Sequence, residues 1–163
     1  MNVMPHPGAT AIMPLVALFG LLVWCAAEDI RTRTIPHAAV AAIIVVYAFY
    51  ALAGHADWVS GLIGGGALLV IGFVLFSLHL MGGGDAKMIA ALGLWVGLHH
   101  LVPFILYTAV AGGLVSLCVL LIHRFKARNS GNVMETAPTV PYGVAIALGG
   151  SIAAWQAFLT EAI

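Results

Sequence analysis

The sequence is poor in charge. Only 7% of its 163 residues are Asp, Glu, Lys or Arg, whereas an ordinary soluble domain carries about 25%. A water-soluble fold with so few charges would expose apolar surface over most of its exterior. Lys and Arg together number 6, and nucleic-acid binding needs a dense basic face. A soluble domain and a nucleic-acid-binding protein are therefore both excluded.

Cysteine is also scarce. Cys25 and Cys118 are the only two, and both lie in apolar runs. Two cysteines cannot form a disulfide framework or a four-cysteine zinc site. Each is interpreted as a small buried hydrophobe, and the sequence predicts neither a metal site nor a cofactor.

Long apolar runs dominate the chain, which is 63% hydrophobic with a mean hydropathy of +1.09. A spanning helix needs about 20 mostly apolar residues. We predict an all-α polytopic membrane protein with six transmembrane helices, forming one domain over residues 1–163 in the lipid bilayer. The expected helices are 11–27, 36–54, 59–80, 86–100, 103–123 and 138–160. The first is expected to be a retained helix, since residues 1–10 lack the basic residues of a signal peptide.

The basic residues predict the orientation. All six fall in or beside the loops after the first, third and fifth helices: Arg31, Arg33, Lys87, Arg124, Lys126 and Arg128. Because basic loops stay in the cytoplasm, both termini are expected outside it, in a multi-pass inner-membrane protein. Residues 124–137 are interpreted as a long polar cytoplasmic loop. The Gly61/Gly65 and Gly93/Gly97 pairs predict close helix packing.

Two aspartates are expected to meet. Asp29 closes the first helix and Asp85 opens the fourth on the same side, whereas Asp57 is a full helix away, about 30 Å. Two adjacent carboxyl groups share one proton, so the ionised group can take a proton from water while the other polarises a carbonyl. The alternative is a pair of interfacial acids, each satisfied separately by water or arginine.

Glycines precede the second aspartate, in the run Gly82-Gly83-Gly84-Asp85. They indicate a place where the backbone bends or another chain approaches closely. Gly82-x-Gly84-Asp85 matches the GxGD motif of the intramembrane aspartyl proteases, and Lys87 extends it to GxGDxK. Three patches, in order, resemble the type IV prepilin peptidases: Asp29 before Ile35-Pro36, the GxGD run, and Pro141-Tyr142-Gly143.

This resemblance implies a prepilin leader peptidase in which Asp29 and Asp85 are catalytic. Its substrate would have a basic leader, a glycine before the cut and a hydrophobic helix after it. Cleavage would take place at the cytoplasmic membrane face. The chain lacks the paired CxxC motifs of the larger bifunctional members, so methyltransferase activity and zinc are not expected. The short form resembles the peptidases of tight-adherence (Flp-type) pilus systems, and His37 stands where family members often have Asn.

Several readings remain open at this stage. Archaeal preflagellin peptidases are a related possibility, and pseudopilins are further candidate substrates. A small proton-coupled transporter could use the same aspartates as a proton relay, and a non-catalytic assembly subunit would need neither. Lys87 is either a topological anchor or a charge beside the aspartates, and Glu28 is a candidate contact for the basic leader. The oligomeric state is not determined.

Overall fold

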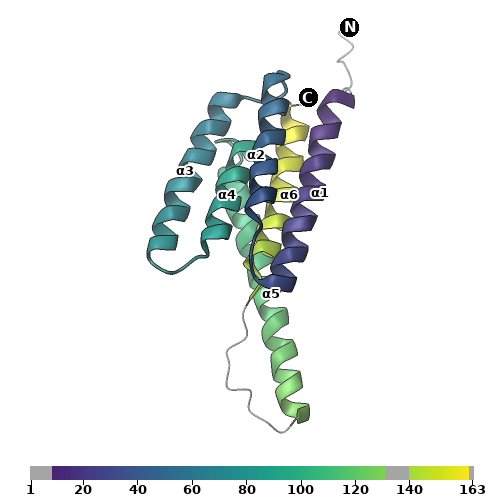
Figure 1. Ribbon diagram of the computed structural model, residues 1–163, viewed down its shortest axis with the longest axis vertical. Helices are drawn as coiled ribbons and strands as arrows, with labels where there is room; N and C mark the ends of the chain where they lie inside the picture. The colour runs from purple at the N-terminus through teal and green to yellow at the C-terminus, as the bar shows by residue number, and fades with distance from the viewer. Residues whose placement is uncertain (1–8, 131–139, 162–163) are drawn as a thin grey trace.

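The computed structural model describes residues 9–130 and 140–161, which form six helices and no strand (Figure 1). All six predicted helices are therefore present within the described chain. Their bounds are α1 Ala9–Thr32, α2 His37–Leu52, α3 Trp58–Ser77, α4 Gly83–Val96, α5 Leu101–Ser130 and α6 Tyr142–Glu161.

Four of these helices are long and apolar enough to cross a membrane: α1, α3, α5 and α6. The other two are shorter, with 16 residues in α2 and 14 in α4. At about 1.5 Å per residue, α4 is about 21 Å long, less than the roughly 30 Å of the hydrocarbon core. The all-helical class is thus confirmed and the four candidate spans are consistent with a membrane protein, whereas six complete spans stay a prediction.

Several predicted boundaries are wrong by three residues or more; for example, the fourth helix ends at Val96 and not at 100, and the sixth begins at Tyr142 and not at 138. The first helix continues to Thr32, so Asp29 lies inside its last turn instead of closing it. The fifth helix continues to Ser130, so residues 124–130 are helical and not part of a loop. This extension contains no glycine or proline, and its Lys, Arg and Ala residues favour helix. Residues 131–139 of the expected loop lie outside the described residues.

Glycine allows α3 and α4 to pack closely, as the two glycine pairs predicted. A Cβ atom on Gly93 would lie 2.8 Å from Cα of Gly65 and 3.0 Å from the carbonyl oxygen of Gly64. Backbones can approach this closely only where side chains are absent. The resulting packing contacts stabilise helix association in lipid, where no hydrophobic effect brings helices together. The α3–α4 pair therefore forms the most extensive helix contact in the described chain.

An aromatic cluster holds α2 against α4. The Trp95 ring stacks on Tyr50 with centroids 5.3 Å apart and meets Tyr47 edge-on at 5.7 Å. Its buried indole Nε1 donates a hydrogen bond of 3.2 Å to the carbonyl oxygen of Ile43. Because the ring nitrogen is satisfied, a large amphipathic side chain can be buried there without an unpaired donor.

The helices give the bundle two distinct ends (Figure 1). The start of α1, the α2–α3 turn and the end of α6 lie at one end, and the end of α1 and the starts of α4 and α6 lie at the other. Because Asp29 lies in the last turn of α1 and Asp85 in the first turn of α4, both lie at this second end of the bundle. Helix α5 packs along α6, scarcely touches α4, and extends well beyond the second end.

Candidate active site

Asp29 lies in the last turn of α1 with only 6% of its surface exposed. Its Oδ2 accepts a 2.7 Å hydrogen bond from the backbone N–H of Gly143, which is 114 residues away at the start of α6. The first N–H groups of a helix have no partner within it, and the helix dipole favours negative charge there. The start of α6 therefore holds the Asp29 side chain in place.

This contact requires a glycine at position 143. A Cβ atom there would lie 2.9 Å from Oδ2 of Asp29 and 3.0 Å from its Cγ. Any other residue would force the carboxyl group or the helix to shift. The Pro-Tyr-Gly patch at 141–143 thus has a structural role in positioning the first aspartate.

Asp85 lies in the first turn of α4, which begins after Gly82. A Cβ atom on Gly82 would lie 3.1 Å from Oδ2 of Asp85, and one on Gly84 would lie 3.2 Å from Cβ of Ile35. The first glycine leaves room for the carboxyl group, and the second lets the α1–α2 connection pack on the start of α4. The expected close approach is therefore present, although the approaching backbone belongs to this chain.

The connection after α1 reverses sharply. Arg33 adopts a left-handed conformation with φ of 56°, and its N–H donates to the carbonyl oxygen of Asp29 at 3.0 Å. A left-handed residue commonly ends a helix in this way. The chain then turns so that Ile35 is buried, 6% exposed, and Pro36 directly precedes α2. The Ile-Pro patch therefore joins α1 and α2 beside the start of α4.

Both aspartates line one cavity of about 260 Å³ between the end of α1, the α1–α2 connection and the start of α4. Its other lining residues are Arg33, Thr34, Ile35, His37, Gly82, Gly83 and Gly84. Burial, together with the negative charge of Asp29, raises the pKa of the Asp85 carboxyl group to about 6, against the opposing effect of a hydrogen bond with the Gly82 backbone. Asp85 therefore keeps a proton to higher pH than an ordinary aspartate does.

Most of the predicted site residues gather at this cavity or support it. Lys87 does not, since it is exposed and lines a different cavity between α2, α3 and α4, which favours its reading as a topological anchor. Glu28 is half-buried and does not line the aspartate cavity. Tyr142 is 55% exposed and lines a neighbouring groove that also contains Asp85.

Sequence reasoning missed one lining residue and undervalued another. Thr34 lines the cavity without having been singled out, and Arg33 was interpreted mainly as a topological determinant. The left-handed turn at Arg33 brings this short connection into the site. The proximity of Arg33 and Thr34 to Ile35-Pro36 in the sequence is the only signal that could have indicated that this connection lines the site.

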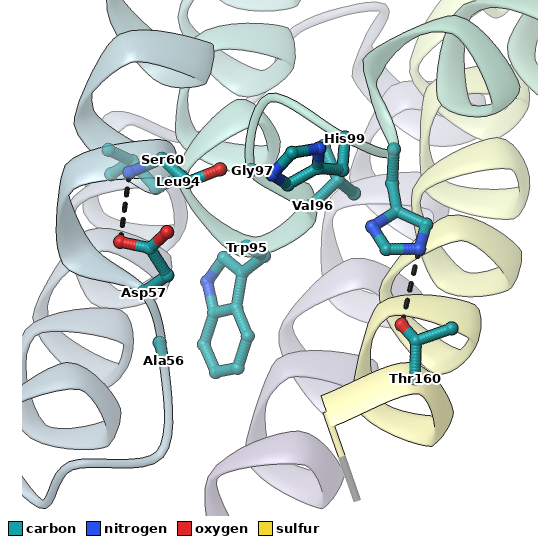
Figure 2. Close-up of a pocket in the computed structure, with 10 residues that line it drawn as sticks. Ala56, Asp57, Ser60, Leu94, Trp95, Val96, Gly97, His99 and Thr160 are labelled. Carbon is teal, nitrogen blue, oxygen red and sulfur yellow. Dashed lines mark hydrogen bonds between the residues drawn. The ribbon is translucent and has the colours of Figure 1, made fainter. Parts of the chain in front are cut away.

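A second cavity, of about 300 Å³, lies at the opposite end of the bundle and contains neither Asp29 nor Asp85 (Figure 2). Asp57 lines it, but its Oδ1 accepts hydrogen bonds from the N–H groups of Val59 and Ser60 and so caps α3. Nε2 of His100 lies 3.3 Å from Oγ1 of Thr160. In the described part of the chain, no three His, Cys, Asp or Glu side chains form a group suited to a metal ion. These polar groups have structural partners.

Two carboxyl groups, the buried one of Asp29 and the half-buried one of Asp85, therefore line one cavity of the helical bundle. The sequence model of the type IV leader peptidase family matches residues 16–117, which include both aspartates. The chain belongs to this family, which confirms the resemblance and makes the protein a peptidase-family member. No curated protein and no solved structure matches the chain.

Proposed function

We propose that this protein is a prepilin leader peptidase of the short, Flp-type form, and that Asp29 and Asp85 activate water for the cleavage. The observation that carries the proposal is that these two aspartates, 56 residues apart in sequence, line the same cavity. The family supports peptidase chemistry in general. The identity of the two catalytic residues and of the substrate belongs to the proposal.

The two aspartates have different surroundings, which assigns them different roles. Asp85 is assigned as the proton donor of the pair, because burial and the charge of Asp29 raise its pKa to about 6, so that it binds a proton more readily than an ordinary aspartate. Asp29 is the base: its Oδ2 accepts a hydrogen bond from a backbone N–H of Gly143, which can only donate. Asp29 thereby keeps a fixed orientation towards the cavity.

The reaction follows from these roles. Asp29 takes a proton from a water molecule as the water oxygen attacks the carbonyl carbon of the scissile peptide bond. Asp85 donates its proton to the carbonyl oxygen, giving a neutral tetrahedral diol. Asp29 then returns a proton to the peptide nitrogen, the C–N bond breaks and the amine departs, and Asp85 recovers its proton from a hydroxyl group of the diol as the new carboxyl group forms. No metal ion or nucleophilic side chain takes part.

The charge distribution supports cleavage at the cytoplasmic face of the inner membrane. Arg31, Arg33 and Lys87 lie at the same end of the bundle as the two aspartates, and basic residues mark cytoplasmic loops. Glu28 adds negative charge to the adjacent face of α1 at this end. Together with the aspartates it would attract a basic leader, because the positive and negative charges would complement one another.

The experiment co-expresses the enzyme with candidate prepilins that carry a basic leader ending in glycine, and follows loss of the leader by gel shift. The variants are Asp29→Asn and Asp85→Asn, with Asp57→Asn as the matched control. Asn can also cap a helix, so the control keeps the start of α3 intact. We expect no processing by the first two variants, and wild-type processing by the control, at equal membrane levels.

Wild-type processing by either Asp29→Asn or Asp85→Asn would refute the aspartate pair. Absence of processing by a well-inserted wild-type protein, with proton-driven solute flux in vesicles, would instead favour the transporter that the sequence left open.

A further inference from the structure

A groove lies between α4 and α5 because these two helices scarcely touch, while both pack on α6. It encloses about 380 Å³. Its lining comes from the α3–α4 connection and from all three helices, and most of it is apolar or small: Leu80, Met81, Ile89, Ala109, Gly112, Gly113, Ala145 and Ile146. Asp85 also lines this groove.

The groove follows the axis of α5. Its lining on this helix runs from Thr108 to Ser116, two residues eight positions apart, which gives a rise of about 12 Å, or about two turns of an α-helix. Helices α5 and α6 are antiparallel, with Thr108 beside Gly149 and Gly112 beside Ala145. The Ser116 end is therefore level with Tyr142 and the catalytic cavity, and the Thr108 end lies deeper in the bundle.

Asp85 is shared by the groove and the catalytic cavity, and the two spaces differ in character. The cavity is lined by polar groups and glycine backbone, including Arg33, Thr34 and His37. The groove is mostly apolar. A peptide that passes Asp85 would therefore have a polar segment on one side of the cut and an apolar segment on the other.

We propose that the α4–α5 groove binds the first two turns of the apolar helix that follows the cleaved bond of the substrate. This inference rests on the proposed function, whose substrate has a polar leader before the cut and a hydrophobic helix after it. The helix would start at Asp85 and run towards Thr108.

A second apolar cavity is larger but fits the substrate less well. It encloses about 520 Å³ between α2, α3 and α4, on the other side of α4. Neither Asp29 nor Asp85 lines it, and the exposed Lys87 does. A helix held there would begin beside a cation and away from the carboxyl groups. Of these two spaces, only the α4–α5 groove is lined by a proposed catalytic residue, Asp85.

Three glycines allow a sharp test. No atom lies within 4 Å of a Cβ built on Gly113 in the α4–α5 groove, on Gly66 in the cavity between α2, α3 and α4, or on Gly20 of α1. All three are in helices, where leucine is favoured over glycine, so each substitution to Leu adds a side chain whose Cβ has open space around it. Gly113→Leu would fill the proposed binding groove, and Gly66→Leu and Gly20→Leu are matched controls.

Each variant is purified and tested on two substrates: a full-length prepilin, and a short peptide with the leader and the scissile bond but without the apolar helix. We expect Gly113→Leu to lower kcat/KM for the full-length prepilin at least tenfold, mainly through KM. Its rate on the short peptide should equal the wild-type rate. Gly66→Leu and Gly20→Leu should match wild type on both substrates.

Wild-type processing of full-length prepilin by Gly113→Leu would overturn the groove assignment. An equal loss on both substrates would also overturn it, because the added leucine would then be disturbing the aspartates. A selective loss in Gly66→Leu instead would assign the helix to the cavity between α2 and α3. If wild-type enzyme cleaves neither substrate, the proposed function itself fails, which is a distinct result.

Discussion

Gly143 offers a quantitative test of how the first aspartate is held. In Gly143→Ala, the new Cβ would lie 2.9 Å from Oδ2 of Asp29, whereas ordinary contact begins at 3.4 Å. The carboxyl group and the start of α6 must therefore separate by the difference, 3.4 − 2.9 = 0.5 Å. The 2.7 Å hydrogen bond would lengthen to about 3.2 Å, the upper limit for a good N–H···O bond.

This displacement should lower both stability and activity. Overpacking of this kind costs about 1–3 kcal/mol of stability. A misplacement of about 1 Å can cost about 100-fold in rate, so a shift of half that size predicts a fall in kcat of about tenfold. KM should change little, because Gly143 lines neither the catalytic cavity nor the groove.

The assay measures kcat and KM for leader removal by purified enzyme in detergent, and thermal unfolding of the same samples. Gly20→Ala is the control, because no atom lies within 4 Å of its Cβ and alanine is favoured by about 1 kcal/mol in a helix. A wild-type kcat for Gly143→Ala would show that the start of α6 does not position Asp29 for catalysis.

Two further predictions concern pH and helix packing. Asp85 must be protonated and its pKa is raised to about 6, so kcat/KM should fall as pH rises through about 6. Bound substrate adds burial, so the fall in kcat should come at higher pH; pH profiles with no alkaline fall would contradict this role. Gly93→Ala should destabilise the protein by about 1–3 kcal/mol, because its Cβ would lie 2.8 Å from Cα of Gly65. Unfolding in detergent measures this, and stability equal to that of Gly66→Ala would argue against the close α3–α4 contact.

The helices and the aspartate pair could be predicted because each depends on local or one-dimensional information. Apolar runs identify helices because the backbone N–H and C=O groups of a segment in lipid must form hydrogen bonds within that segment. Because successive helices are expected to cross the membrane in opposite directions, the end of the first helix and the start of the fourth are expected at one depth. Asp29 and Asp85 accordingly line the same cavity. The GxGD and Ile-Pro patches carried the family resemblance, and the family match agrees with it.

Helix boundaries were less predictable, because hydropathy reports lipid contact and not hydrogen bonding. Residues 124–130 are polar and were expected to form a loop, yet α5 continues through them to Ser130. Asp29 is polar too, but lies inside α1. A charged residue can remain helical where another element supplies its partner or where the helix leaves the hydrocarbon core.

By itself, then, the sequence determined the helical membrane class, the order of the helices, the glycine faces of α3 and α4, and the identity of the two aspartates that can meet. Only the tertiary structure decided what surrounds them. The hydrogen bond from Gly143 to Asp29 joins residues 114 positions apart, and the turn at Arg33 needs a left-handed backbone that no motif specifies. The groove between α4 and α5 likewise exists because both helices pack on α6 and not on each other. Such features follow from which helix faces pack together, and hydropathy along a single helix carries no information about its partner.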